Sequence, residues 1–471
     1  MTAVALATTL TLAEVLAGTG GVLAASPARS EEQDLSGVSI DSRTTRPGEL
    51  FVAIQGPRFD GHDFVAHAAR RGAAAALVHH DADAPAGLPL VRVDDTTRAL
   101  GALAHHVRGK ATAPVVGITG SVGKTTTKDM TATLLETRGP VLRTAANLNN
   151  EYGLPLTLLG LREKHTAAVL EMGMSAPGEL RTLSAIAEPD VAVITRVAPV
   201  HLEFFPSVDA IAEAKAEVLE GVRPGGTAVL NGDDPRLRRV GESWGGRVVW
   251  FGRDRRHDVS AERWRGTVFG MRFDLRVDGR SVDVALPLAG PHFVENFLAA
   301  AAVAHVLGVT PETMAAAAAG LGPGRHRGEV RRLAEGITLI DDSYNSSPEA
   351  LEASVVTLTL APARRRVAVV GDMLELGETA PGLHRESGRA LAGRVDVVVG
   401  VGPLSKEILA GARAAGLAED ALAHFDDAAA AAAAVGDLVH SGDAVLVKAS
   451  RGIHLEKVVD AITSRFGGGE A

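Results

Sequence analysis

The chain lacks cysteine, and this absence excludes disulfides, iron–sulfur clusters and thiolate metal sites. Such a composition fits a reducing compartment, so we expect a cytoplasmic protein. Aromatic residues make up only 4% of the sequence, so the cores must be built from alanine, valine and leucine. No uninterrupted apolar run approaches the ~18 residues of a membrane span. The formal net charge of −9 gives no basic field for nucleic acid.

The alanine-rich amino-terminal stretch has some features of a secretory signal. No lysine or arginine precedes Arg29, however, and Glu14 interrupts the apolar residues. A signal peptide needs a basic start followed by an unbroken apolar segment. We therefore expect that this stretch is not a signal.

The 471 residues are too many for one ordinary core, and 46% of them are hydrophobic, which favours several globular domains. Three blocks are apparent, with predicted bounds of 1–111, 112–324 and 325–471. In the first block, apolar runs alternate with helical patterns, the last of which leads out of the block. The expected strands are 50–54 and 74–78, and the expected helices are 63–71 and 96–110.

The second and third blocks alternate short apolar runs with helical stretches, a pattern typical of parallel β-α-β units. Between 266 and 288, two alternating runs flank Asp278-Gly279, which predicts a β-hairpin at an antiparallel sheet edge. The Ala run after Asp427 is expected to be a capped helix. The predicted fold class is α/β with a mainly parallel central sheet. The other expected strands are 115–119, 167–170, 191–195, 227–230, 337–340, 367–370, 395–399 and 444–447.

The run Gly120-Ser121-Val122-Gly123-Lys124-Thr125-Thr126 follows one of these strands and precedes a helical stretch. That context is the one a phosphate-binding loop requires, because backbone N–H groups and a helix N-terminus face the phosphates. Lys124 is expected to reach the β- and γ-phosphates of ATP, and the Thr125 hydroxyl to bind Mg²⁺. The long form of this motif needs glycine at position 118, where Ile118 stands. The alternative is a glycine-rich turn with an exposed lysine.

Three further residues are candidate partners of this loop. Glu171 ends a predicted strand, at the sheet edge where open α/β sheets bind ligands. His201 follows another strand, and Lys215 lies in a predicted helix. By position alone, His201 could be an ordinary loop residue and Lys215 a solvated helix residue.

Several runs together resemble the Mur ligases, the ATP-dependent amide-forming enzymes of peptidoglycan precursor synthesis. In the second block they are TGSVGKTTTKD, NLNNEYGLPLTLL, EMGM, HLE and AKAEVLEG. The family carries the shorter phosphate loop, which accounts for Ile118. The resemblance implies three domains: a UDP-binding α/β domain, a central phosphate-loop ATPase domain and a Rossmann-like carboxyl-terminal domain.

Runs in the outer blocks resemble one member of the family in particular. They are the segment 41–73 in the first block, with GDMLELGE and KASRGIHLEK in the third. That member adds D-alanyl-D-alanine to UDP-N-acetylmuramoyl-tripeptide through an acyl phosphate, and it implies a monomer. The Asp-Asn-Pro-Arg run of the sister enzyme that adds diaminopimelate is absent.

The resemblance also implies roles for single residues. Thr125 and Glu171 match the ligands of a first Mg²⁺, and His201 matches a ligand of a second. Lys215 matches a lysine that becomes carbamylated in several members. His292 and Asn296 match the adenine-side motif, although without the resemblance they are read as a capped helix start. Arg327 and Asp342 match residues that reach the nucleotide when the domains close.

Substrate residues follow in the same way. Asn147, Asn149 and Asn150 match a segment that contacts the UDP-sugar peptide, and Arg43 suits a diphosphate. Lys448 and Arg451 could bind the dipeptide carboxylate, and Asp372 could bind its amine or be a simple turn residue. The remaining candidates are Ser42, Asp60, Gly61 and His62 for UDP, and Tyr344, Asn345 and Ser450 for the dipeptide.

Two rival interpretations stay open at this point. Another ligase of the same superfamily would share the central block without the outer motifs. Examples are a folylpolyglutamate synthase and the Mur ligase that adds the third residue of the peptide. A nucleotide-binding scaffold without activity is the other rival. Such a scaffold would be expected to have lost some of Lys124, Glu171, His201 and Lys215, all of which are present.

Overall fold

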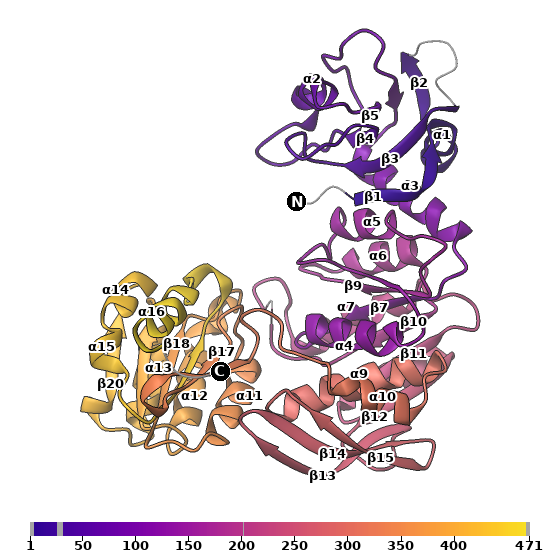
Figure 1. The fold of residues 1–471 in the computed structure, drawn as a ribbon. Coiled ribbons are helices and arrows are strands. Elements are labelled where there is room, and N and C mark those ends of the chain that lie inside the picture. Colours follow the sequence, from indigo (N-terminus) through magenta and orange to yellow (C-terminus); the bar gives the residue numbers. More distant parts are fainter. Residues whose placement is uncertain (1–3, 26–31, 201, 468–471) are drawn as a thin grey trace.

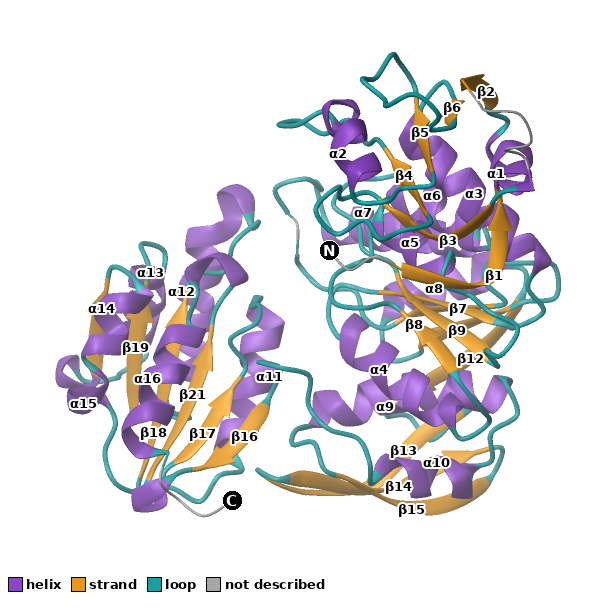
Figure 2. Cartoon of the chain, turned by 45° about the horizontal axis from the view of Figure 1, so that its top comes forward, coloured by secondary structure: helices purple, strands orange, loops and turns teal. Residues whose placement is uncertain are grey.

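The computed structural model describes residues 4–25, 32–200 and 202–467. Its described residues form three α/β parts, each built on one β-sheet (Figure 1). The amino-terminal part stacks on the central part, and the carboxyl-terminal part lies beside the central part. Figure 2 shows helices on both faces of the central and carboxyl-terminal sheets.

The amino-terminal sheet has the strand order β1-β3-β4-β5-β6-β2, with its inner strands parallel and both edge pairs antiparallel. Strands β4 and β5 are buried throughout, and apart from Glu49 their residues are apolar. The elements are β1 Val4–Thr11, α1 Leu12–Thr19, β2 Val22–Ala25, β3 Asp34–Ser39, β4 Glu49–Val52, α2 Val65–Arg70, β5 Ala75–Val78, β6 Leu90–Arg92 and α3 Thr96–Lys110.

The central sheet has the order β15-β14-β13-β12-β11-β10-β7-β9-β8, parallel except for β14 and β15 at one edge. Helices α5 to α8 cover one face, and α4, α9 and α10 cover the other. The elements are β7 Val115–Thr119, α4 Lys124–Glu136, β8 Val141–Arg143, α5 Gly153–Leu158, β9 Ala167–Glu171, α6 Glu179–Ala187, β10 Val191–Ile194, α7 Val208–Ala216, β11 Thr227–Asn231, α8 Pro235–Trp244, β12 Arg247–Gly252, β13 Val259–Thr267, β14 Gly270–Val277, β15 Arg280–Leu286, α9 Pro291–Val306 and α10 Pro311–Ala318.

The carboxyl-terminal sheet has the order β16-β17-β21-β18-β19-β20, with only β16 antiparallel to its neighbour. Helices α11 to α13 pack on one face, and α14 to α16 on the other. The elements are β16 Glu329–Arg332, β17 Thr338–Asp341, α11 Pro348–Thr359, β18 Arg365–Gly371, α12 Ala380–Leu391, β19 Val397–Val401, α13 Ser405–Ala414, β20 Leu422–Phe425, α14 Ala428–Ala433, α15 Val435–Leu438, β21 Asp443–Lys448 and α16 Glu456–Phe466.

Helix α3 joins the first two parts. It begins at the N-cap Asp95, whose side chain accepts from the backbone of Thr97 and Arg98. Near its end, the buried Arg108 guanidinium donates to the Ala187 carbonyl at 2.9 Å and to Asp190 at 2.7 Å. A buried cation needs such partners, so Arg108 fixes the amino-terminal part on the central one.

The turn between β13 and β14 joins the central and carboxyl-terminal parts. Val268, at this turn, is 1% exposed and packs in the carboxyl-terminal core with Ile340 and Leu351. Phe269, the residue after Val268, also contacts the carboxyl-terminal part, because the guanidinium of Arg332 lies 4.1 Å from the centroid of its ring. A central hairpin tip thus forms part of the third core.

The predicted fold class and the alternation of elements are confirmed, as are the helix over 96–110, the strand over 115–119 and the edge hairpin through Asp278-Gly279. Asp427 caps α14 as expected. The sequence did not reveal β13, which extends the central sheet before the hairpin. Among the described residues, no helix has the length and apolar character needed to cross a membrane.

Candidate active site

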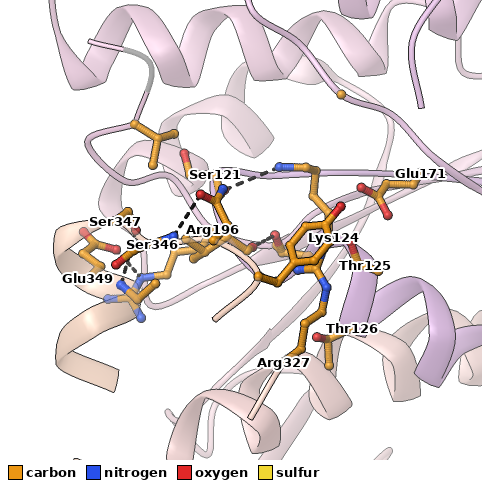
Figure 3. A pocket seen from close by; sticks show the side chains of 18 of the residues that line it. Ser121, Lys124, Thr125, Thr126, Glu171, Arg196, Arg327, Ser346, Ser347 and Glu349 are labelled. Carbon is orange, nitrogen blue, oxygen red and sulfur yellow. Dashed lines mark hydrogen bonds and ion pairs between the residues drawn. The ribbon is translucent and has the colours of Figure 1, made fainter. Parts of the chain in front are cut away.

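A cavity of about 1270 Å³ lies between the central and carboxyl-terminal parts. Its central wall comes from the loop 121–126, the ends of β9 and β10, and the start of α9. Its opposite wall comes from the loop after β17, the start of α11, and the loops after β18 and β21. Figure 3 shows side chains from both walls pointing toward one another.

The loop between β7 and α4 is shaped by two glycines. Gly120 has φ +150°, and a Cβ there would lie 1.9 Å from the Thr195 hydroxyl oxygen. Gly123 has φ +85°, and its Cβ would lie 2.3 Å from the Asn296 side-chain oxygen. The Ser121 amide donates to the Arg196 carbonyl at 2.7 Å. Glycine is therefore required at both positions, and the loop is held against the end of β10.

Lys124 opens α4 and folds back over this loop. Its Nζ donates to the carbonyls of Gly120 at 2.7 Å and of Ser121 at 3.4 Å. Burial lowers its pKa, while the carboxylates of Glu171 and Glu375 oppose that shift. Lys124 lies at the N-terminus of a helix, where anions bind, and burial disfavours its charge unless an anion compensates it.

Glu171 ends β9 and faces the same region as the loop (Figure 3). Its Oε1 accepts from the Asn149 amide at 2.9 Å, whereas Oε2 is buried with no hydrogen-bond partner among the described residues. Thr125, in the first turn of α4, lines the cavity with it. A buried carboxylate oxygen without a donor in the described part of the chain, in the same cavity wall as a hydroxyl, suits a hard cation such as Mg²⁺.

Lys215 lies near the end of α7 and is 1% exposed. Burial, and then the charge of Lys124, lower its pKa well below 10.5. Its amine is therefore biased toward the neutral, nucleophilic form. His201, the other residue expected in this region, lies outside the described residues.

The first two turns of α9 also lie against the loop. Asn296 Oδ1 accepts from the Thr127 hydroxyl at 3.5 Å. Burial lowers the pKa of His292 to about 4, and its Nδ1 has no partner among the described residues. The imidazole is neutral at physiological pH, so it presents hydrogen-bonding atoms without a charge.

The opposite wall carries a cation held by its own domain. Lys448, at the end of β21, is 2% exposed, and its Nζ donates to Asp342 Oδ2 at 2.6 Å and to the Asn345 carbonyl at 2.9 Å. Ser354 also donates to Asp342, at 2.6 Å. Lys448 therefore reaches the cavity wall with its charge already compensated.

Two arginines on this wall lie near the ring of Tyr344. The Arg327 guanidinium lies 3.8 Å from the ring centroid, and that of Arg451 lies 5.7 Å away. Arg451 also pairs with Glu456 at 3.4 Å. Both guanidiniums line the cavity, so this wall offers two cations to an anionic ligand.

Three family models match the chain in order. "Mur ligase family, catalytic domain" covers residues 34–108, "Mur ligase middle domain" covers 118–304, and "Mur ligase, glutamate ligase domain" covers 326–451. Two relatives are named UDP-N-acetylmuramoyl-tripeptide–D-alanyl-D-alanine ligase. The Escherichia coli relative is 39% identical, over 91% of this chain and 94% of its own. The Bacillus subtilis relative is 36% identical, over 91% and 93%. The chain belongs to the Mur ligase family.

Solved structures agree with this assignment. MurF from Acinetobacter baumannii is 31% identical with a TM-score of 0.90, over 97% of this chain and 99% of that one. MurF from Thermotoga maritima, solved with ADP, is 33% identical with a TM-score of 0.81, over 91% and 97%. A folylpolyglutamate synthase from Mycobacterium tuberculosis shares the fold at 18% identity, with a TM-score of 0.61 and coverage of 80% and 95%.

Within this Mur ligase, most of the expected nucleotide and dipeptide residues line one cavity. Asp372 is an exception, since its carboxylate is buried and accepts from the Ser405 amide at 2.8 Å. Lys215 is not in the cavity lining either. The expected residues that do line it are Ser121, Val122, Gly123, Lys124, Thr125, Thr126, Asn147, Asn149, Asn150, Glu171, His292, Asn296, Arg327, Asp342, Tyr344, Asn345, Lys448, Ser450 and Arg451.

The residues expected to contact UDP lie apart, in the amino-terminal part. The Ser42 hydroxyl contacts His67 Nδ1 at 2.9 Å, and Asp60 accepts from His62 at 2.6 Å. Gly61 is required, because a Cβ would lie 2.6 Å from the Ile54 nitrogen. Arg43 is exposed and paired with Asp41. None of the five expected residues lines the cavity.

Several charged residues that line the cavity of the Mur ligase were not predicted, among them Arg196 and Glu375. Arg196 follows β10 and forms ion pairs with Glu295 at 3.2 Å and with Glu349 at 3.3 Å. Glu375 lies three residues after Asp372 and lines the cavity in its place. Glu375 lies in the run GDMLELGE, from which the sequence predicted Asp372 as the site residue.

Proposed function

We propose that this Mur ligase joins D-alanyl-D-alanine to UDP-N-acetylmuramoyl-tripeptide with hydrolysis of ATP, giving the pentapeptide precursor of peptidoglycan. The relatives that carry this activity in their names match over nearly their whole length. The observation that carries the proposal is a single cavity with the phosphate loop on one wall and Arg327 and Arg451 on the other. The proposal includes a monomer acting in the cytoplasm.

ATP binds along the phosphate loop in this proposal. The amides of 121–126 and the Lys124 ammonium contact the phosphates, and phosphate oxygens replace the loop carbonyls that Lys124 contacts in the structure. His292 and Asn296 hold the adenine side. Arg327 and Asp342 approach the nucleotide from the carboxyl-terminal part, so the site is complete only when both parts meet.

Mg²⁺ fits the oxygen atoms beside the loop. Its proposed ligands are Thr125 and the Oε2 of Glu171, for which no described residue is a hydrogen-bond partner. His201 and carbamylated Lys215 are the proposed ligands of a second ion. Bound there, the ions neutralise charge on the phosphates and the acyl phosphate.

The environment of Lys215 supports the proposed carbamylation. A neutral amine adds to CO₂ to form a carbamate and release a proton, which converts a cation into an oxygen ligand. Burial biases Lys215 toward that neutral amine. A carbamate on Lys215 is negatively charged, so it attracts the Lys124 ammonium instead of repelling it.

The chemistry then has two steps. A carboxylate oxygen of the tripeptide attacks the γ-phosphorus, and the bond to ADP breaks. The dipeptide amine next attacks the acyl carbon, an amide bond forms, and phosphate leaves. Both steps bring anions together, so positioning and charge neutralisation by Lys124 and Arg327 dominate catalysis.

The UDP end of the substrate extends from the cavity toward the amino-terminal part. Asn147, Asn149 and Asn150 hold the peptide side where the two parts meet, and Ser42, Arg43, Asp60, Gly61 and His62 contact UDP. The proposed domain bounds are 1–111, 112–324 and 325–471. They are supported by the loops between α3 and β7 and between α10 and β16, in which they fall.

The test is product analysis by mass spectrometry. Enzyme with ATP, Mg²⁺ and UDP-N-acetylmuramoyl-tripeptide should form the pentapeptide only when D-alanyl-D-alanine is present. Product with diaminopimelate, lysine or glutamate as acceptor would point to a sister ligase instead. No product with any of these amines would leave a nucleotide-binding scaffold.

A further inference from the structure

Four charged residues that line the cavity form a network between the central and carboxyl-terminal parts. In the central part, Glu295 of α9 pairs with both Arg253 and Arg196, and the Nη1 of Arg196 lies 3.2 Å from the Oε2 of Glu295. The Nε of Arg196 also lies 3.3 Å from the Oε2 of Glu349, in the first turn of α11. Glu349 is therefore the member of the network that the carboxyl-terminal part supplies.

The charges of these four residues balance only when the two parts meet. Two arginines and one glutamate leave the central part with one positive charge in excess, and Glu349 cancels it. The Oε2 of Glu349 is buried and has no hydrogen-bond partner among the described residues. Burial raises the pKa of Glu349, and the charge of Arg196 opposes that shift. Since a buried carboxylate needs a compensating cation, Glu349 depends on Arg196 in this arrangement.

Arg196 also belongs to the segment that holds the phosphate loop. The Ser121 amide donates to the Arg196 carbonyl at 2.7 Å. Two residues later, the Ala198 carbonyl accepts from the Ser121 hydroxyl at 3.1 Å, and the Ala198 amide donates to the same hydroxyl oxygen at 2.9 Å. One short segment thus carries both the ion pair with α11 and the hydrogen bonds that place the loop (Figure 3).

We propose that Arg196 is a positioning residue, whose ion pair with Glu349 holds the carboxyl-terminal part against the phosphate loop when the site is assembled. This inference rests on the proposed function, in which Arg327 and Asp342 reach the nucleotide from that part. Ligands that touch both walls stabilise the paired arrangement. The pair favours the binding of those ligands to the same extent, because linkage between two equilibria is reciprocal.

The two partners of the ion pair are not equivalent, and this difference gives the test. Arg196→Gln leaves the Glu349 carboxylate buried without its cation when the parts meet, and an unpaired buried charge is unfavourable. Glu349→Gln leaves Arg196 still paired with Glu295. Arg196→Gln should therefore oppose the meeting of the two parts more strongly than Glu349→Gln. The double variant should recover most of the loss, because it no longer contains the unpaired carboxylate.

The first measurement is the affinity for a non-hydrolysable ATP analogue in the presence of the tripeptide substrate. The Arg196 side chain is 45% exposed, so solvent screens the pair and the effects are moderate. Arg196→Gln should weaken binding about threefold to tenfold, and Glu349→Gln about twofold or less. Arg239→Gln, on the exposed face of α8 and outside the cavity, is the control and should bind as wild type does.

The second measurement follows the two parts directly by fluorescence energy transfer. Because the chain has no cysteine, Glu242→Cys in α8 and Asp420→Cys before β20 provide two labelling positions, both exposed. Labelled enzyme with otherwise wild-type sequence, saturated with the analogue and the tripeptide substrate, defines the paired arrangement. Arg196→Gln should lower the population of that arrangement, and addition of Glu349→Gln should restore most of it.

Three results would overturn the inference: unchanged analogue binding in Arg196→Gln, an unchanged population of the paired arrangement, or a double variant as impaired as Arg196→Gln. The last result would place the guanidinium on the ligand itself. Neither measurement requires amide formation. A wild-type enzyme that forms no pentapeptide would contradict the proposed function, so that failure is observed separately.

Discussion

At the scale of single residues, the site region contains two buried lysines, Lys124 and Lys215, whose charged forms are disfavoured by their surroundings. Burial lowers the pKa of both Lys124 and Lys215, and the charge of Lys124 lowers that of Lys215 further. Such an arrangement costs stability unless anions compensate it. ATP phosphates would compensate Lys124, and a carbamate would remove the charge of Lys215. Both residues could be picked out from the sequence, but only the structure reveals their shared burial.

Lys124→Ala should lower ATP turnover on the order of a hundredfold or more, because the γ-phosphate loses its principal side-chain cation. The measurement is phosphate release with all substrates present. Lys406→Ala, on the exposed face of α13, is the control and should keep wild-type turnover. Retained turnover in Lys124→Ala would remove the phosphate-loop assignment.

Lys215→Ala should be inactive and should regain part of its activity with added acetate or formate. These short carboxylates can occupy the space of the carbamate and supply its oxygen atoms. Activity is measured across a range of carboxylate concentrations, with chloride at equal ionic strength as control. Full activity without any addition would contradict the metal role of Lys215.

At the scale of elements, parallel strands with uninterrupted apolar sequences were predictable, as β7 and β10 illustrate, because burial on both faces dictates their composition. Helix α3 was predictable from its cap and its length. Strand β13 was not, since its exposed second half carries the polar run Glu262–Thr267. The loop of Glu375 was also missed, because nothing local indicates which acidic side chain of that run faces the cavity.

Gly123→Ala should raise the KM for ATP about tenfold, since a positive φ costs on the order of 1 kcal/mol for alanine and its Cβ would strike Asn296. Gly382→Ala, in α12 with open space around it, is the matched control. The control should be neutral or slightly stabilising in thermal unfolding. An unchanged KM in Gly123→Ala would show that the loop does not hold the nucleotide.

Val268→Ala should loosen the carboxyl-terminal part. The substitution removes methyl groups from its core, at a cost of roughly 2 kcal/mol. We expect faster tryptic cleavage at Arg325 and Arg327, in the segment that joins the two parts. Val282→Ala, in β15 and packed against the central core, is the control and should not accelerate this cleavage. Equal cleavage rates would mean that the hairpin tip does not anchor the third part.

At the scale of the whole molecule, the arrangement of the three parts depends on contacts between distant segments. Arg108 bonds to Asp190, and Val268 packs among residues of the carboxyl-terminal core. The ion pair between Arg196 and Glu349 also spans the cavity region. No local pattern predicts such pairs, so the sequence indicated which residues belong to the site but not how its two walls meet.

The most direct test of the central claim is phosphate release from ATP with Mg²⁺ and UDP-N-acetylmuramoyl-tripeptide, with and without D-alanyl-D-alanine. Rapid release is expected only when both the tripeptide substrate and the dipeptide are present, with one phosphate released for each pentapeptide formed. Release that is indifferent to the dipeptide, or none under any of these conditions, would contradict it.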